Sequence, residues 1–185
     1  MLQLNFTPFP QFETERLLLR KIGQADAPEI FFLRSDESVL KYIGKEPAKT
    51  IQEAEEFIEK IESGINSNQT IMWGIVLKEN PEKLIGTICF WNIQMEHHRT
   101  EIGFMLDPDF WRKGIMKEAI NTILEYGFNS MKLHSVEGRI HVDNIASASV
   151  LESTGFQKEG YLKEDFFFRG KFLDTIIYSR LNIKT

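Results

Sequence analysis

The chain has 185 residues, 42% of them hydrophobic and 26% charged, which fits one globular domain with a sizeable core. Its 22 Lys and Arg against 27 Asp and Glu give a formal net charge of −5, so the basic excess of a nucleic-acid-binding protein is missing. No stretch approaches the roughly 20 apolar residues that span a membrane. Cys89 is the only cysteine, which excludes an intramolecular disulfide and fits a reducing cytoplasm. We therefore expect a cytoplasmic protein with no direct nucleic-acid partner and no membrane partner.

The first segments of the chain predict an arm, a strand and a helical region. Residues 1–11 predict an irregular N-terminal arm, ahead of one domain that spans residues 12–182. The short apolar run Glu15–Ile22, with charged ends, predicts a strand. Apolar residues recur at helical spacing from Ala25 to Ile43, and two short helices separated near Ser35–Asp36 fit this pattern best.

The middle of the chain predicts a capped helix and two strands. Thr50-Ile51-Gln52-Glu53 is a capping box, in which the Thr hydroxyl and the Glu carboxylate satisfy free amides at a helix start. We expect that helix to reach about Ile65. Strands are predicted over Ile71–Leu77 and Leu84–Ile93, joined by the turn Glu79–Glu82.

The second half predicts alternating strands and helices that end in a hairpin. The expected elements, in order, are strand Thr100–Leu106, helix Arg112–Phe128, strand Ser135–Val142, helix Ile145–Ser153, and strands Lys158–Phe168 and Phe172–Leu181. Gly155 stops the last helix, and Arg169–Gly170 turns the hairpin. This order describes an α/β (α+β) domain in which a mixed sheet carries helices on both faces.

The stretch from Glu101 to Phe128 carries the clearest chemical signal. Gly114 stands where a strand has ended and a helix begins, and the first four amides of a helix lack internal partners. Those amides and the helix dipole favour an anion, and glycine lets the backbone approach a phosphate closely. Arg112, Lys113 and Lys117 add positive charge nearby. The turn predicts a phosphate site, with a chance basic helix start as the alternative.

The residues around this turn resemble a known coenzyme motif. The turn is neither a P-loop nor a dinucleotide fingerprint, because no Gly-Lys-Ser/Thr follows it and Gly114 is its only glycine. Phe110–Ala119 instead resembles the acetyl-coenzyme A motif of the GNAT acetyltransferases, Gln/Arg-x-x-Gly-x-Gly/Ala. It is most similar to the RimJ/RimL branch, which acetylates N-termini of ribosomal proteins. Four further segments agree in order: Thr14–Arg20, Glu101–Leu106, Asp143–Phe156 and Glu159–Tyr178.

The resemblance implies a fold and a cosubstrate. The implied GNAT fold is a single domain with a mixed, mostly antiparallel central sheet, in which parallel strands at residues 102–106 and 135–142 splay apart and helices cover both faces. The implied cosubstrate is acetyl-coenzyme A, with no metal. The residues that the resemblance places on it are Phe104, Met105, Leu106, Arg112, Lys113, Gly114, Ile115, Met116, Lys117, Asn144 and Ser147.

The motif is departed from at two positions. Trp111 stands where Gln or Arg is usual, and Met116 stands where Gly or Ala is usual. Both positions mainly present backbone amides to phosphate, so we expect coenzyme binding to survive. A Met side chain at this place is expected to narrow the cradle.

The resemblance also implies roles near the thioester. Asn144 bonds the pantetheine, and its alternative role is to cap the helix that starts at Ile145. Ser147 lies near the sulfur. Many GNAT enzymes protonate the leaving thiolate with a Tyr, but Leu151 occupies that position here. Ser147 is therefore the candidate donor, with water as the alternative, and a thiol pKa near ~8.5 makes the thiolate a tolerable leaving group.

The general base is less clearly marked. Glu101 is a candidate base, directly or through water, and a purely structural carboxylate is the alternative. Glu164 and Asp165 lie near the place of the base in the RimL-like branch, but they are not in clear register with it. A protein N-terminus asks less of a base than a Lys side chain does, since the α-amine has a pKa near ~7.7–8.0 against ~10.4 for Lys.

Other conspicuous side chains have a plain structural interpretation. His97–His98 lacks the helical spacing of metal ligands, and we interpret the pair as exposed loop residues. Phe31, Phe32, Trp73 and Trp91 are candidates to wall an acceptor pocket, with the hydrophobic core as the alternative for each.

Together these features predict an N-acetyltransferase that moves an acetyl group from acetyl-coenzyme A to a primary amine. The first candidate acceptor is a protein N-terminal α-amine of the ribosomal-protein type. The alternatives are a small amine (an amino acid, polyamine or aminoglycoside) or a non-catalytic acyl-coenzyme A-binding module. The resemblance also implies a homodimer, because members of this branch are often dimers.

Overall fold

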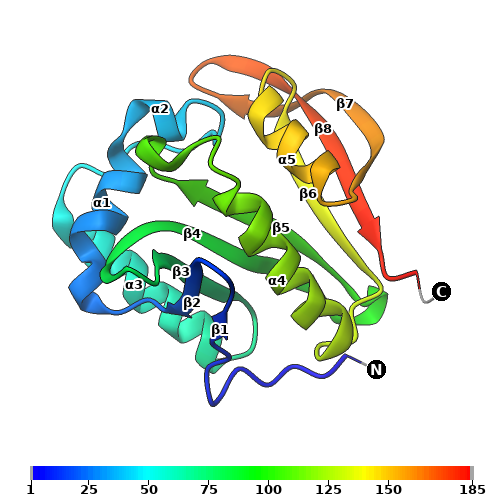
Figure 1. Cartoon of the computed structure of the whole chain (residues 1–185). Helices are drawn as coiled ribbons and strands as arrows, with labels where there is room; N and C mark the ends of the chain where they lie inside the picture. Colours follow the sequence, from blue (N-terminus) through cyan, green and yellow to red (C-terminus); the bar gives the residue numbers. More distant parts are fainter. Residues whose placement is uncertain (1, 184–185) are drawn as a thin grey trace.

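The computed structural model describes residues 2–183. Within them the strands form one eight-stranded sheet in the order β1-β2-β3-β4-β5-β6-β8-β7 (Figure 1). The strands are β1 Phe12–Glu13, β2 Leu17–Lys21, β3 Ile71–Leu77, β4 Asn80–Gln94, β5 Arg99–Leu106, β6 Ser135–His141, β7 Gln157–Phe168 and β8 Lys171–Leu181. The helices are α1 Ala27–Ser35, α2 Glu37–Leu40, α3 Ile51–Asn66, α4 Ile115–Asn129 and α5 Ile145–Ser153, with short 3₁₀ turns η1 Gln24–Asp26, η2 Met95–His97 and η3 Pro108–Phe110.

Helices cover both faces of the sheet, as expected. In Figure 1, α4 and α5 lie over one face, while α1 and α3 pack on the other. Trp73 of β3 points to the first face, where its ring meets Tyr126 of α4 edge-on at 5.9 Å between centroids. Every neighbouring strand pair is antiparallel except β5 and β6, which α4 connects as a crossover.

The parallel pair β5–β6 is short and then opens. The two strands pair only from Arg99 with Ser135 to Glu101 with Glu137. Beyond this point β5 stays paired with β4 up to Leu106, and β6 stays paired with β8 up to His141. The predicted splay is therefore confirmed, although the first three residues of β6 still belong to the closed part.

The helical spacing of Met116, Ala119, Ile120, Ile123 and Leu124 predicts one apolar stripe, and α4 buries it together with Ile115. The predicted start at Arg112 is wrong by three residues. Arg112 and Gly114 have φ angles of 60° and 75°, in the left-handed region, which a right-handed helix cannot contain. Its first hydrogen bond runs from the Glu118 amide to the Gly114 carbonyl, at 3.1 Å. The residues from Arg112 to Gly114 thus form a turn ahead of the helix.

Two other boundaries differ from expectation. Strand β4 starts at Asn80 rather than Leu84, because Asn80 pairs with Leu77 and the turn shrinks to Lys78–Glu79. The capping box at α3 is shifted: the Thr50 hydroxyl accepts from the Glu53 amide, but the Glu53 carboxylate accepts from the Lys49 amide instead of that of Thr50. Glu53 therefore extends the cap by one residue.

The N-terminal arm packs against the domain. Leu2 and Phe6 are buried, and the Gln3 amide donates to the Met131 carbonyl just beyond α4. The indole of Trp73 donates to the Pro10 carbonyl at 2.7 Å. The division at residue 12 stays a prediction, since the arm and the core share these contacts. None of the helices within residues 2–183 combines the length and apolar character needed to cross a bilayer.

The packing of α4 gives a stability prediction. Replacing the fully buried Ile123 by Ala is expected to lower the free energy of unfolding by about 2–5 kcal/mol, because it removes apolar contacts and leaves a cavity. Urea unfolding measures this change. Glu125→Ala, on the exposed face of the same helix, is the control and should stay within about 0.5 kcal/mol of the wild type. Equal effects of the two substitutions would contradict the assigned faces of α4.

Candidate active site

The opening between β5 and β6 brings two helix starts to one edge of the sheet. Each strand is followed by a helix, α4 after β5 and α5 after β6, and both helices begin at the end where the strands part (Figure 1). The facing backbone edges of Ile102–Leu106 and Gly138–His141 have no ladder partner across the opening. A crevice of this kind, at the carboxyl ends of parallel strands, is where open α/β sheets bind ligands.

The turn from Arg112 to Gly114 presents its backbone outward at the start of α4. Its residues are exposed, whereas Ile115 and Met116, the next two, are buried. The amides before Glu118 precede the first helical hydrogen bond and are free to meet an anion. The positive φ of Gly114 makes glycine the favoured residue there. The geometry fits a phosphate cradle.

The two departures from the motif have separate consequences. The Met116 side chain is buried in the core, so the expectation that it narrows the cradle is wrong. The indole Nε1 of Trp111 donates to the Leu106 carbonyl at 2.8 Å, which ties the turn to the end of β5. One lone pair of that carbonyl is thereby used, whereas the indole itself remains 43% exposed.

Asn144 and Ser147 lie together at the start of α5. The Asn144 side-chain oxygen accepts from the Ser147 amide at 3.1 Å, so Asn144 is the N-cap of this helix. Capping uses only the oxygen, which leaves the side-chain NH₂ as a further hydrogen-bond donor. Leu151, at the position of the usual Tyr, is fully buried and packs against Gly138 of β6. The pantetheine role of Asn144 and the donor role of Ser147 stay predictions.

Glu101 lies where the parallel strands begin to part, opposite Glu137 in the last ladder pair. It is 8% exposed, and burial raises its pKa, while Arg139, a hydrogen bond from Asn92 and Arg99 act in the opposite direction. Glu137 forms ion pairs with Arg99 and, at 3.6 Å, with Arg139. The neighbouring carboxylate of Glu137 thus has cationic partners, and burial moves the pKa of Glu101 toward neutrality.

The other acidic candidates have different surroundings. Asp165 is bound by the guanidinium of Arg139 at 2.8 Å. Glu164 is exposed in a left-handed conformation, at an irregularity of β7 where its amide donates to Asp174. Asp165 is consequently engaged in an ion pair, and Glu164 serves the backbone geometry of the hairpin. Neither shares the burial of Glu101.

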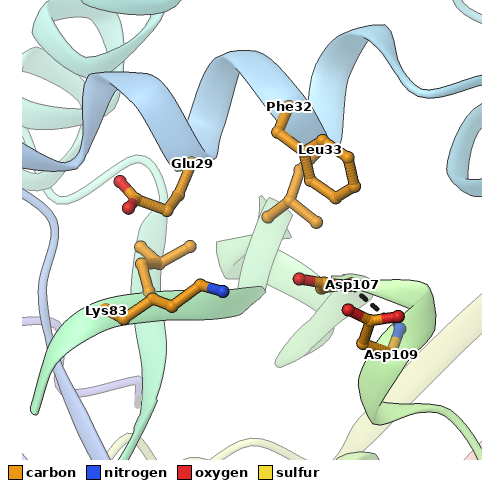
Figure 2. Close-up of a pocket in the computed structure, with 7 residues that line it drawn as sticks. Glu29, Phe32, Leu33, Lys83, Asp107 and Asp109 are labelled. Carbon is orange, nitrogen blue, oxygen red and sulfur yellow. Dashed lines mark hydrogen bonds between the residues drawn. The ribbon is translucent and has the colours of Figure 1, made fainter. Parts of the chain in front are cut away.

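The four candidate wall aromatics separate into different environments. Trp73 is fully buried and belongs to the core. Phe31 is half-buried against that core. Trp91 is exposed and pairs across the strands with Glu101, so it lies beside the opening. Phe32 points from α1 into a hollow of about 250 Å³ (Figure 2). Trp91 and Phe32 remain the candidates for contact with a ligand.

The hollow in Figure 2 lies between α1 and the end of β5. Glu29 and Phe32 line it from the helix, and Lys83, Asp107 and Asp109 line it from below. Asp107 accepts a hydrogen bond from the Asp109 amide at 2.9 Å and so caps η3. The lining of this hollow includes none of the residues predicted to hold the coenzyme.

Sequence patterns gave no role to two residues that lie near the opening. Tyr42, after α2, stacks on His141 at the end of β6, with ring centroids 5.5 Å apart. The Asp143 amide donates to Nδ1 of His141 at 3.1 Å, so Nδ1 acts as an acceptor. These rings come from segments about 100 residues apart, and no local pattern signals such a contact. His97 is exposed in η2 and His98 half-buried beside it, and residues 2–183 contain no cluster suited to a metal ion.

The fold and the site together define a class of protein. Its open sheet has a parallel strand pair that parts beside a turn suited to phosphate. A coenzyme with a pyrophosphate and an extended arm needs such an arrangement. The sequence pattern of the acetyltransferase (GNAT) domain matches residues 16–157. The chain belongs to the GNAT acetyltransferases. It is an acetyl-coenzyme A-dependent N-acetyltransferase, and acetyl-coenzyme A is its cosubstrate.

Relatives and solved structures agree with this assignment. The chain is 37% identical to the uncharacterized N-acetyltransferase YoaA of Bacillus subtilis strain 168, over 92% of this chain and 96% of the relative. The ribosomal-protein-S5-alanine acetyltransferase from Vibrio fischeri superposes with a TM-score of 0.80 at 28% identity, covering 94% of this chain and 97% of that one. The spermidine N-acetyltransferase from Vibrio cholerae, in complex with CoA and spermine, gives 0.80 at 27% identity, covering 91% and 96%.

The buried thiol beside the opening gives a second prediction. Burial raises the pKa of Cys89 to about 12, so the reactive thiolate is disfavoured at pH 8. A disulfide reagent such as DTNB should label the native protein very slowly and the urea-unfolded protein rapidly, with one thiol per chain. Rapid labelling of the native protein would contradict the burial of Cys89.

Proposed function

We propose that this enzyme acetylates a primary amine, and that its acceptor is a protein N-terminal α-amine of the ribosomal-protein type. The observation that carries the proposal is the crevice itself, where free strand edges, a phosphate cradle and a buried carboxylate meet. The similarity to the S5-alanine acetyltransferase structure supports the acceptor class. A cytoplasmic location and a homodimer belong to the same proposal.

The coenzyme lies in the crevice with its pyrophosphate at the turn. Backbone amides of the turn and of the helix start hold the phosphates, and they belong to Arg112, Lys113, Gly114, Ile115, Met116 and Lys117. Positive charge comes from the side chains of Arg112, Lys113 and Lys117. Binding needs the phosphate charge to be offset, because the protein as a whole carries −5. The exposed position of the three cations supports this role.

The acetyl-pantetheine arm runs along β5. The backbone of Phe104, Met105 and Leu106 bonds the arm, and an amide from this edge polarises the thioester carbonyl, which contributes roughly 3–4 kcal/mol when it meets the oxyanion. Asn144 offers its NH₂ to the pantetheine, and Ser147 returns a proton to the leaving thiolate. The position of both residues at the start of α5, on the opposite wall, supports this arrangement.

Glu101 is the general base. Strand alternation places its side chain on the face opposite Ile102, which packs near Leu151 of α5, so Glu101 lies on the face away from α5. An amine that approaches from the side of α1 and α2 meets Glu101 and Trp91 before the thioester. Its raised pKa improves its strength as a base for an α-amine, directly or through one water.

A polyamine is the second candidate acceptor. The similarity to the spermidine N-acetyltransferase favours it, and the net charge of −5 suits a cationic substrate. The amines of a polyamine have a pKa comparable to that of a Lys side chain, which is higher than that of an α-amine. Their deprotonation therefore needs a stronger base. The charged neighbours Glu137 and Asp165 are already paired with arginines, which leaves less free negative charge to bind a polycation.

An amine panel distinguishes these acceptors. Coenzyme A release from acetyl-coenzyme A is measured with four candidate acceptors. The first is an unblocked peptide that begins with Ala and contains an internal Lys, and the second is this peptide with its N-terminus acetylated. The third and fourth are spermidine and a free amino acid. We expect the unblocked peptide to accelerate release most, and the blocked peptide to give background. Acceleration by spermidine alone would replace the first acceptor by the second. If no amine accelerates release, the proposed reaction is wrong.

The base assignment makes a pH prediction. Glu101→Gln should lower kcat by about 10²–10⁴, the usual contribution of a general base. In the wild type kcat falls as pH decreases through the raised pKa of Glu101, because the carboxylate must be ionised to accept a proton. The Gln variant should lose this acidic limb. Glu125→Gln on the exposed face of α4 is the control, and a wild-type pH profile in Glu101→Gln would remove Glu101 from the mechanism.

A further inference from the structure

The segment before β2 reaches the phosphate cradle through one side chain. Arg16 lies about 100 residues before the turn in sequence, yet its Nη1 donates to the Lys113 carbonyl at 2.8 Å. Its Nη2 would be 3.4 Å from a Cβ placed on Gly114. The guanidinium therefore lies directly against the left-handed part of the turn.

The same guanidinium is locked by a carboxylate of α4. Nε of Arg16 donates to Glu118 at 2.8 Å and Nη2 lies 2.7 Å from the same oxygen, while the Arg16 amide and the Thr14 hydroxyl donate to the other oxygen. Burial by itself raises the pKa of Glu118, but these hydrogen bonds from Thr14 and Arg16 lower it below its usual value. Glu118 is thus a fixed anion one turn into the helix.

This arrangement matters for an anion at the helix start. Arg112 is left-handed like Gly114, and a residue other than glycine persists in this conformation only where surrounding contacts hold the turn. Arg16 holds the carbonyl of Lys113, the residue between them. It also neutralises Glu118, whose carboxylate would otherwise repel a phosphate at the same helix end.

We propose that Arg16 is a positioning residue for the coenzyme pyrophosphate, because it holds the cradle turn by the Lys113 carbonyl and shields the phosphates from Glu118. The proposal rests on the cradle described under Proposed function. It assigns a coenzyme-binding task to the residue just before β2, far in sequence from the turn itself. Acetyl-pantetheine, which lacks the pyrophosphate, gains nothing from it.

The test compares two ligands, coenzyme A and S-acetylpantetheine, by titration of the full-length protein. Arg16→Ala should weaken coenzyme A binding about tenfold or more, as expected for loss of a charge-assisted contact. Its binding of S-acetylpantetheine should stay within about twofold. Arg16→Lys keeps the charge without the planar fork and should recover part of the loss. In Arg16→Ala/Glu118→Gln, removal of the unpaired carboxylate should make the loss smaller than in Arg16→Ala.

Two reference variants separate the possible failures. Lys21→Ala breaks an ion pair with Glu62 at the far end of β2 and should bind coenzyme A as the wild type does. Gly114→Glu, with a carboxylate in the cradle, should abolish coenzyme A binding; if it binds normally, the cradle assignment itself is wrong. If Gly114→Glu does not bind coenzyme A but Arg16→Ala binds it like the wild type, only the role of Arg16 is overturned. Equal weakening of both ligands in Arg16→Ala would show a merely structural role and would also overturn it.

Discussion

The site depends on one constraint, the end of pairing between β5 and β6 after Glu101 and Glu137. Up to this pair the two strands satisfy each other's backbone groups. Beyond it, each strand keeps its outer neighbour and turns a free edge toward the opening. Buried backbone groups need partners, so this edge is stable only where a ligand or water can reach it. The opening thereby creates a site for an extended, hydrogen-bonding arm without a dedicated side chain.

The two helices that follow the strands supply what the free edges lack. The start of α4 offers amides and nearby cations for phosphate, and the start of α5 offers Asn144 and Ser147. The cradle is fixed from two directions: Trp111 ties it to the end of β5, and Arg16 ties it to β2 and Glu118. A turn with two left-handed residues needs such external contacts to keep one conformation.

Charge is distributed differently on the two sides of the opening. The cradle side is cationic and exposed, which suits a coenzyme that arrives from solution. Where the strands begin to part, Glu101 and Glu137 lie beside Arg99 and Arg139, and burial raises the pKa of Glu101. Cys89, close by, is buried, and burial raises the pKa of its thiol and so disfavours the thiolate that a nucleophile needs. The chemistry therefore favours direct attack by the amine over an acyl-enzyme through this thiol.

The sequence by itself determined the order of the elements, the apolar stripe of α4 and the glycine turn ahead of this helix, because these depend on local periodicity, caps and a glycine. Tertiary structure decided the rest. The helix start lies at Ile115 rather than Arg112, and Asp165 is paired with Arg139 through an irregularity in β7. The contacts of Arg16 with Lys113 and of Tyr42 with His141 join residues about 100 positions apart. Such contacts follow from how the chain folds back on itself, which no local pattern encodes.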